Sequence, residues 1–365
     1  MPTKLIYLKL FNFNFYCLML NKTPDNPPKI KPYDGNDSIL WSVMIPVYNC
    51  FNYIQITLNS VLQQAPSSEL MQIEVIDDCS TDGDVEKLVN EVGKGRITYY
   101  RQQQNVGSLR NFETCINRSK GKYIHLLHGD DKIDFGFYNE IETLFHNFPQ
   151  AGAAFTNFKY IDSKNNLVDI KNKKILDSPG EILNFIDMIA VRQLIQPPAM
   201  VVKRTTYETL GSFFAVHFGE DWEMWTRIAS KFPIVYSPKY LAFYRVFHGI
   251  GISHNSFITG QNVMDMKKVI NIIQNYIPVN KQSKIKKASL EYYAKYCAKV
   301  ANSLLLDNKD AAFRQIRGAW SISKDYKTLF WIVRFYSMYI LRYKQIENLW
   351  YSTKKNASKM KLNNF

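Results

Sequence analysis

The sequence has none of the glycine-rich loops by which many proteins hold phosphate groups. No loop of the form G-x-x-x-x-G-K-S/T is present, and the nearest stretch, Gly93-Lys-Gly-Arg96, has the wrong form. A nicotinamide-type G-x-G-x-x-G is also missing. A nucleotidyltransferase carries a glycine-rich, Lys- or Arg-bearing loop after its first strand, and Tyr48-Asn-Cys-Phe51 is not such a loop. These absences argue against P-loop, dinucleotide-binding and nucleotidyltransferase proteins.

Cysteine is scarce and unpatterned. The five cysteines form no C-x-x-C pair, and their odd number does not suit a complete disulfide framework; they are Cys17, Cys50, Cys79, Cys115 and Cys297. We therefore expect neither a zinc site of the cysteine type nor a disulfide scaffold, and we expect a reducing compartment.

Long hydrophobic runs are also lacking. The apolar stretch Leu5–Leu20 is interrupted by Lys9, Asn12 and Asn14, and it is shorter than the ~20 apolar residues of a membrane span. It is either a poorly ordered extension or an amphipathic anchor. Residues 22–38 are rich in Pro, Asp, Asn and Lys, which is typical of a linker. We expect residues 1–40 to be an N-terminal extension and linker.

Acidic residues are rare in the last third of the chain. Gln261–Phe365 contains 20 Lys or Arg and 6 Asp or Glu, so this region accounts for the whole net charge of +14. Such a region binds a polyanion, for which we expect an anionic membrane surface and no nucleic acid, or it is simply a solvated basic face. From Ser283 onward the apolar spacing is helical, and Leu329–Tyr343 suits either a membrane interface or an ordinary core.

What the sequence does have is apolar and aromatic residues, with 23 Tyr and 23 Phe in 365 residues, enough for one large or two modest domains. Expected strands alternate with expected helices from residue 41 onward, which predicts a βαβ arrangement and a mainly parallel sheet. The expected strands are 41–48, 71–76, 96–101, one from 123 and 151–158, and the expected helices are 53–65, 85–92, 109–118 and 219–231. Residues 159–178 are expected to form an insertion or a hairpin.

Carboxylates follow these strands where each one ends. Asp78 closes the second strand, and Asp130 and Asp131 close the fourth. Open α/β sheets bind ligands outside the carboxyl ends of their strands, and Mg²⁺ or Mn²⁺ prefers carboxylate and phosphate oxygens. The pattern predicts a metal and nucleotide-diphosphate site at Asp130 and Asp131; the alternative is a polar turn after a buried strand.

Four segments in order resemble family 2 glycosyltransferases with the GT-A fold: Ile45-Pro-Val-Tyr-Asn49, Val75-Ile-Asp-Asp78 with Ser80-Thr-Asp82, Gly129-Asp-Asp131 and Glu220-Asp-Trp222. The resemblance covers about Ser42–Ser253. It implies an α/β GT-A fold, that is, a Rossmann-like, mainly parallel central sheet flanked by helices, at residues 41–255. Residues 256–365 are expected to form a basic helical C-terminal region.

The resemblance also implies the donor site. Pro46, Tyr48 and Asn49 match positions beside the nucleotide base, and Asp78 matches the acid that hydrogen-bonds a uracil-type ring. Arg110 matches a residue near the nucleotide.

The family's D-x-D motif falls on His128-Gly-Asp130, followed by Asp131 as a further acid. The resemblance implies that Asp130 contacts the nucleotide sugar and that Asp130 and Asp131 hold Mn²⁺ or Mg²⁺. His128 departs from the family pattern, because it stands in place of the first acid.

The Glu-Asp pair of the family falls on Glu220 and Asp221, and Asp221 matches the catalytic base. An inverting transfer needs a carboxylate to take the proton of the acceptor hydroxyl. Glu220 is expected to raise the pKa of Asp221 by like-charge repulsion and to help bind the acceptor. Trp222 is counted among the nucleotide-sugar contacts. The alternative is an acidic first turn of a helix, with Trp222 in the core.

Tyr244-Arg-Val-Phe-His248 with Ser253 resembles the family's closing loop, although one extra residue separates Arg245 from His248. The resemblance implies that Arg245 holds phosphate oxygens and that His248 binds the metal. A surface loop is the alternative.

Taken together, these residues predict a metal-dependent, inverting glycosyltransferase of the hexosyltransferase type. It would move a sugar from a nucleotide-diphosphate donor, expected to be a UDP-sugar, to a saccharide or lipid-linked acceptor in surface polysaccharide synthesis. We expect it in the cytoplasm, peripheral at the inner face of the membrane. The alternative is a non-catalytic nucleotide-sugar or membrane-binding module with a GT-A-like fold.

Overall fold

The computed structural model describes residues 22–35, 39–170, 172–246 and 251–342. The chain divides into two compact units. Unit 1 comprises Met1–Ile250 with Asn275–Ile277, and unit 2 comprises Gly251–Gln274 with Pro278–Phe365.

Unit 1 is built on one mixed sheet in the order β3-β2-β1-β4-β9-β6-β10-β5, with β7 paired to β6 and β8 paired to β10. The strands are β1 Trp41–Val47, β2 Met71–Asp77, β3 Thr98–Arg101, β4 Tyr123–Leu126, β5 Lys132–Ile133, β6 Ala153–Ile161, β7 Leu167–Val168, β8 Gly180–Glu181, β9 Met200–Lys203 and β10 Ile234–Arg245. The first four strands are parallel and so are β6 and β10, whereas β9 runs antiparallel to both of its neighbours. The α/β fold class is therefore confirmed, with antiparallel pairs added to the parallel ones.

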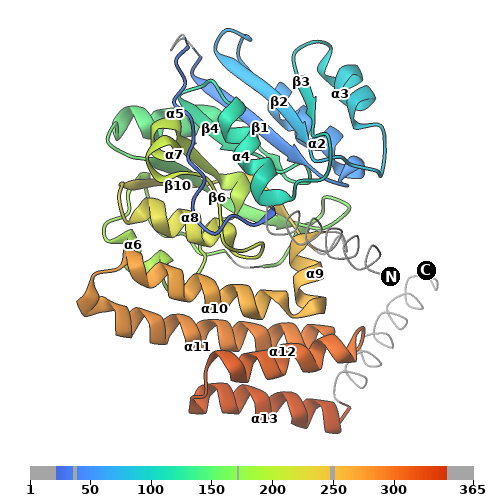
Figure 1. The fold of residues 1–365 in the computed structure, drawn as a ribbon, viewed down its shortest axis with the longest axis vertical. Helices are drawn as coiled ribbons and strands as arrows, with labels where there is room; N and C mark the ends of the chain where they lie inside the picture. Colours follow the sequence, from blue (N-terminus) through green and yellow to red (C-terminus); the bar gives the residue numbers. More distant parts are fainter. Residues whose placement is uncertain (1–21, 36–38, 171, 247–250, 343–365) are drawn as a thin grey trace, which may run out of the picture. The chain divides into compact units, whose positions relative to one another are not determined.

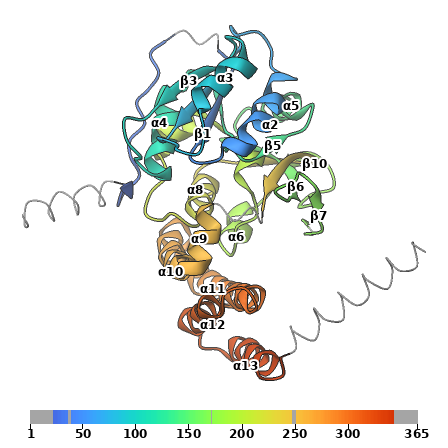
Figure 2. The same ribbon diagram turned by 90° about the vertical axis from the view of Figure 1, so that its right-hand side faces the viewer.

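Helices cover both faces of this sheet (Figures 1 and 2). They are α2 Phe51–Leu62, α3 Val85–Gly93, α4 Ser108–Arg118, α5 Phe137–Asn147, α6 Phe185–Ile189, η1 Pro197–Ala199, α7 Arg204–Leu210 and α8 Glu220–Ala229. The α2 and α3 helices pack together, and α4 lies on the opposite face, as right-handed βαβ connections require. Every residue of β1 is buried, which is typical of a central strand covered on both faces.

Several expected elements are confirmed in unit 1. The polar stretch after the fifth expected strand contains a hairpin, since Tyr160 pairs with Val168 and Ile161 with Leu167 in antiparallel β6 and β7. The elements that had not been predicted include α5 and the long strand β10. Both elements are part of the sheet's construction. The β10 strand lies between β6 and β5 in the sheet, and α5 connects β5 to β6 along the chain.

The described residues before β1 lie along unit 1. Lys22 Nζ donates to Asn105 Oδ1 at 2.8 Å, and the Ser212 amide donates to the Pro28 carbonyl at 2.8 Å. Ile30 is buried. This stretch, expected to be a linker, thus makes specific contacts with the sheet domain. The expected anchor or extension at Leu5–Leu20 lies outside the described residues.

Unit 2 is helical, as expected. Its helices are α9 Ile252–Thr259, α10 Gln261–Ile273, α11 Val279–Leu304, α12 Lys309–Ile322 and α13 Tyr326–Ile340, and the short η2 Gln274–Tyr276 follows α10. Figures 1 and 2 show α10 to α13 stacked side by side. A reciprocal pair of amide hydrogen bonds between Asn262 and Gln315 is buried inside the stack. In the part of the chain that the structure describes, no helix combines the length and hydropathy needed to cross a bilayer.

Candidate active site

The centre of the site is the loop at residues 128–131, which follows β4 and is called the acid loop below. Gly129 lies so close to the end of β1 that an added Cβ would meet Val47 Cγ2 at 2.9 Å, and it would also meet Cys50 Sγ at 2.8 Å. Only glycine fits such an approach. The Gly129 amide donates to the Pro46 carbonyl at 3.1 Å, and Thr57 Oγ1 of α2 donates to the carbonyls of Gly129 at 3.0 Å and Asp131 at 2.6 Å. Because β1 and α2 both hold this backbone, the turn places two carboxylates at the edge of the sheet.

Asp131 is the buried member of the acid loop, with 1% of its surface exposed. Its Oδ1 accepts the Arg245 amide at 2.8 Å, and among the described residues its Oδ2 has no hydrogen-bond partner. Burial, and then the negative charge of Asp130, raise the pKa of Asp131. A buried carboxylate oxygen without a partner is costly, and a bound cation would satisfy it.

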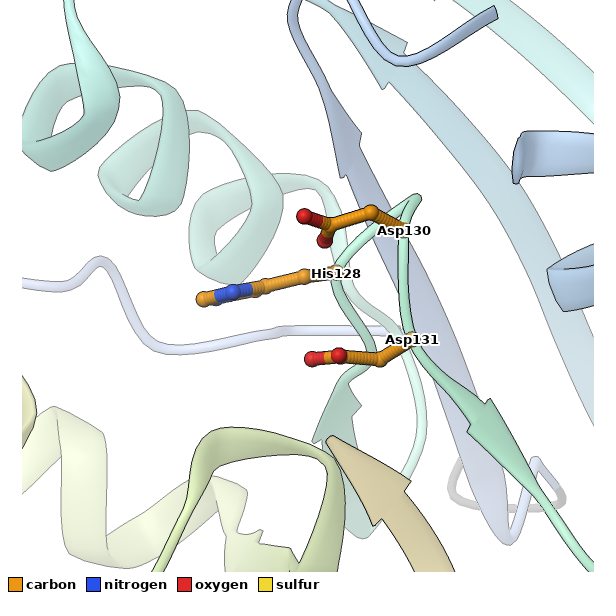
Figure 3. Close-up of side chains that lie close together, drawn as sticks. All are labelled: His128, Asp130 and Asp131. Carbon is orange, nitrogen blue, oxygen red and sulfur yellow. The ribbon is translucent and has the colours of Figure 1, made fainter. Parts of the chain in front are cut away.

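His128, Asp130 and Asp131 each offer one ligand atom, and these atoms lie within 4.8 Å of one another. Figure 3 shows the three side chains projecting from the loop toward the same side. The His128 ring lies parallel to that of Phe112 on α4, with centroids 5.2 Å apart and an interplanar angle of 11°. Burial lowers the pKa of His128. The acid loop thus presents one imidazole and two carboxylates, a donor set that fits a divalent cation.

The guanidinium of Arg245 holds loops together. Nε donates to the Asp130 carbonyl, NH1 to the Asp162 carbonyl and NH2 to Asn165 Oδ1, each at 2.6 Å. These bonds tie the end of β10 to the acid loop and to the turn after β6. The expected phosphate contact would require Arg245 to exchange some of them. His248, the other residue expected from this segment, lies outside the described residues.

The end of β2 fixes a second loop. Asp78 accepts hydrogen bonds from the amides of Val106 at 2.7 Å and Gly107 at 2.9 Å and from Asn105 Nδ2 at 2.9 Å. Burial raises the pKa of Asp78, and the two backbone donors lower it. Asp78 therefore orders the loop that leads into α4. Arg110, in the first turn of that helix, pairs with Glu113 at 2.7 Å.

The end of β1 carries the other residues expected beside a nucleotide. Pro46 lies in the strand, and Tyr48 just after it is 53% exposed. Asn49 has a φ of 50°, and its Oδ1 accepts the Thr81 amide at 2.8 Å. The Asn49 amide donates to Ser80 Oγ at 3.0 Å. Asn49 thus joins the loops after β1 and β2.

The Glu-Asp pair lies in the first turn of α8, after Gly219 with its φ of 87°. Asp221 accepts hydrogen bonds from the Trp222 amide at 2.7 Å and from Gln193 Nε2. Burial is the largest cause that raises the pKa of Asp221, to about 7. Trp222 is 0% exposed, and its indole donates to the Ile189 carbonyl at 2.6 Å. Trp222 thus occupies the core position that had been the alternative.

One cavity joins residues that lie far apart in the sequence. Its lining includes His128 of the acid loop, Glu220 and Asp221 of α8, and the aromatic rings of Phe112, Tyr207 and Trp225. The geometry therefore brings a candidate base and the acid loop to one place. The sequence had not indicated Gln193 or Phe112, because a glutamine in a loop and a phenylalanine on a helix carry no motif.

Comparisons with known proteins find relatives that are glycosyltransferases. Residues 42–205 match the model of the family described as Glycosyl transferase family 2. The Escherichia coli UDP-Glc:alpha-D-GlcNAc-diphosphoundecaprenol beta-1,3-glucosyltransferase WfaP is 26% identical over 218 residues, which cover 60% of this chain and 81% of WfaP. An uncharacterized glycosyltransferase of Rickettsia bellii is 26% identical over 200 residues, which cover 52% of this chain.

The chain spans only about a quarter to a third of the length of several curated relatives that it matches, with 26% for the Rickettsia bellii protein and 32% for an uncharacterized glycosyltransferase of Mycoplasma genitalium. Among solved structures, S. aureus TarS 1-349 in complex with UDP-GlcNAc has a TM-score of 0.59 at 16% sequence identity, over 78% of this chain and 80% of that chain.

The fold is thus that of a GT-A glycosyltransferase, with a helical region after the sheet domain. Residues 42–205 are thus similar to glycosyl transferase family 2.

Proposed function

We propose that this chain is a metal-dependent, inverting glycosyltransferase that moves a hexose from a UDP-linked donor to a saccharide or lipid-linked acceptor. The observation that carries the proposal is Asp221, a buried carboxylate with a pKa raised to about 7 that lines the same cavity as His128. A base with a pKa near the working pH is most effective in proton transfer. The catalytic domain would be residues 41–255.

In the proposed reaction, Asp221 takes the proton of an acceptor hydroxyl while that oxygen bonds to the anomeric carbon of the donor sugar. The bond from this carbon to the diphosphate oxygen breaks, UDP leaves with the electron pair, and the configuration inverts. Mn²⁺ or Mg²⁺ held by Asp130 and Asp131 would neutralise the charge on the departing diphosphate. The hydrogen bond from Gln193 would orient the base.

We assign the donor nucleotide to the edge where β1 and β2 end. Pro46, Tyr48 and Asn49 would flank the base, Asp78 would contact it or hold the loop that does, and Arg110 would lie beside the nucleotide. The exposed ring of Tyr48 supports this role, because a base needs an accessible apolar face on which to stack. Arg245 and Glu220 would contact phosphate and acceptor, respectively.

The name of WfaP supports the proposed substrate classes. That relative uses UDP-Glc and a sugar linked to diphosphoundecaprenol. A UDP-sugar donor, a lipid-linked acceptor and a place in surface polysaccharide synthesis are the corresponding proposals for this chain.

The test is the variant Asp221→Asn. We expect turnover, measured as UDP release and product formation with UDP-glucose and a lipid-linked saccharide, to fall about 10²- to 10⁴-fold. UDP binding, measured by calorimetry, should stay within about twofold, since Asp221 contacts no part of the nucleotide in the proposed site. Glu142→Gln, an exposed carboxylate change on α5, is the matched control and should keep full activity.

Substantial turnover by Asp221→Asn would remove this residue from the role of base. A wild-type chain that binds UDP and releases none from any UDP-sugar would instead be a non-catalytic binding module.

We further propose that unit 2 binds an anionic membrane at the inner face, which would bring a cytoplasmic enzyme to a lipid-linked acceptor. The α13 helix supports this. Leu329, Phe330, Val333 and Ile340 are exposed, while Phe335 is buried. Spacings of three and four residues put these exposed side chains on one face. The helix contains Lys327 and Arg334 and no acidic residue, which suits lipid head groups of negative charge.

A further inference from the structure

The acid loop contains one donor that the family pattern does not supply. His128 stands where an acid is expected, and its ring nitrogen lies in the same cluster as the carboxylates of Asp130 and Asp131 (Figure 3). We propose that His128 is a direct ligand of the metal ion, and that it makes the site select a first-row transition ion such as Mn²⁺, Fe²⁺, Co²⁺ or Zn²⁺ over Mg²⁺. This inference rests on the metal-dependent transfer proposed above.

The cluster is more than a group of acids on a surface. Asp131 is 1% exposed, and among the described residues its Oδ2 has no partner. One oxygen of the same carboxylate lies in the cluster with the imidazole. A cation is the ligand that best satisfies a buried carboxylate oxygen. Two ligands bound at about 2.1 Å from one ion are at most about 4.2 Å apart. The donor atoms of the acid loop lie within 4.8 Å of one another, so the upper limit is about 0.6 Å longer than two ligands of one ion allow. Small rotations about the side-chain bonds can close this difference.

The charges of the cluster suit a divalent ion. Two carboxylates balance the two positive charges, so a neutral third ligand adds affinity without leaving excess negative charge. An aspartate at residue 128 would add a third negative charge beside Asp131, which already lacks solvent.

The surroundings hold the imidazole in position. Phe112 stacks on the His128 ring at 5.2 Å, which restricts the direction of its nitrogen atoms. Thr57 fixes the backbone at Gly129 and Asp131, and Arg245 binds Asp130 through its carbonyl and Asp131 through Oδ1. Ligands held by packing and by a second layer of hydrogen bonds bind metal with little reorganisation.

The choice of ion follows from the donor set. Mg²⁺ demands oxygen ligands and parts with its water reluctantly, whereas imidazole nitrogen suits later first-row ions. His128 therefore lowers the affinity of the site for Mg²⁺ and raises its affinity for transition ions.

The experiment uses the full chain loaded with Mn²⁺ and reads nitrogen coordination by electron spin-echo modulation. We expect ¹⁴N modulation in the wild type and its loss in His128→Asp. His146→Gln, which removes an exposed imidazole on α5, is the control and should keep the modulation. In parallel, calorimetry on the wild type should give an affinity for Co²⁺ at least about tenfold above the affinity for Mg²⁺. The ratio of these two affinities should be at least about tenfold smaller in His128→Asp.

The variant His248→Gln shows whether the nitrogen ligand comes from His128 or from His248. Loss of the modulation in His128→Asp supports the inference, whether or not His248→Gln also reduces it. Modulation that persists in His128→Asp and disappears in His248→Gln overturns it, and so does a wild type without modulation. If His128→Asp does not fold, His128→Asn provides the same comparison with a neutral side chain of similar size.

The readout is coordination and not turnover, so the two proposals fail separately. An enzyme that transfers sugar without a nitrogen ligand refutes only the role of His128. A chain with the nitrogen ligand and no transfer activity refutes only the proposed reaction.

Discussion

In the proposed reaction, Asp221 sets the pH dependence of turnover. It is buried at the start of α8, and burial raises its pKa to about 7. The carboxylate must be ionised to accept a proton. We therefore predict that turnover rises about tenfold per pH unit below pH 7 and levels off above it. A pH–rate profile of kcat measures this, and a profile that is flat between pH 5.5 and about pH 8 would contradict it.

The raised pKa of Asp221 also affects stability, and here the effect is opposite: stability falls with rising pH, whereas turnover rises. The folded-state pKa of Asp221 lies above the unfolded value, so between roughly pH 4 and pH 7 the folded protein holds a proton that the unfolded chain releases. The contribution of this group to stability is complete below pH 4 and is lost as the pH rises toward 7. Asp221→Asn should remove this slope from the pH dependence of urea unfolding, while Glu142→Gln should keep it.

The sequence was sufficient to find the acids at strand ends, but not to say what each one does. A carboxylate after a strand is visible in the sequence, whereas its partners come from distant loops. Asp78 accepts hydrogen bonds from residues 105–107, and Arg245 donates to the loop after β4. Which hydrogen bonds a side chain makes depends on the tertiary fold, so an ordering role and a binding role look alike in sequence.

At the scale of the element, α8 contains a buried ion pair between Glu223 and Arg227, which lie two and six residues after Asp221. Arg227 NH2 lies 2.9 Å from Glu223 Oε2, and both side chains are almost fully buried. Arg227 also donates to the carbonyls of Leu210 at 2.5 Å and Ser212 at 3.0 Å. The pair fixes the helix that presents the candidate base.

Arg227→Met would leave the Glu223 charge buried without its cation. We predict a loss of about 3–5 kcal/mol in the free energy of unfolding, measured with urea. The double variant Glu223→Leu/Arg227→Met removes both charges and should be less destabilised than the single one. A double variant that is as unstable as the sum of the two single ones would show that the ion pair itself contributes nothing.

The β10 strand shows why some elements were not predicted. Its sequence contains Pro238 and does not alternate between apolar and polar residues. The pairing with β6 is irregular between Ser237 and Ala242, where a bulge accommodates the proline. A bulged strand has no constant period of two, so periodicity does not reveal it. By contrast, β1 and β2 are continuous apolar runs and were predictable.

At the scale of the whole molecule, the chain combines a nearly neutral first part with a basic last part. Residues 261–342, the described part of the basic region, contain 15 Lys or Arg and 5 Asp or Glu. Together with the apolar face of α13, this composition should favour interfaces that are both anionic and apolar.

We predict that the full chain sediments with phosphatidylserine-containing vesicles, and not with phosphatidylcholine vesicles alone, at about 0.1 M salt. Binding should fall several-fold at about 0.5 M salt, because charges are screened. Phe330→Ser and Val333→Ser together should reduce binding at least about tenfold, since about 25 cal/mol is lost per Å² of apolar surface no longer buried.

Val279→Ser at the start of α11 is the control, because Val279 is also exposed and apolar but lies on another helix. Equal binding to neutral vesicles would contradict the prediction, as would an equal loss in the control. Sedimentation equilibrium without lipid reports whether α13 instead covers a second copy of the chain.

The position of Arg245 at the end of β10 also bears on how the protein is made. The acid loop is complete only when the Arg245 amide reaches Asp131 and the guanidinium reaches Asp130, across more than a hundred residues of chain. A ribosome delivers the loop well before it delivers that strand. The nascent chain therefore carries two neighbouring aspartates without the hydrogen bonds from Arg245 until residue 245 has left the exit tunnel.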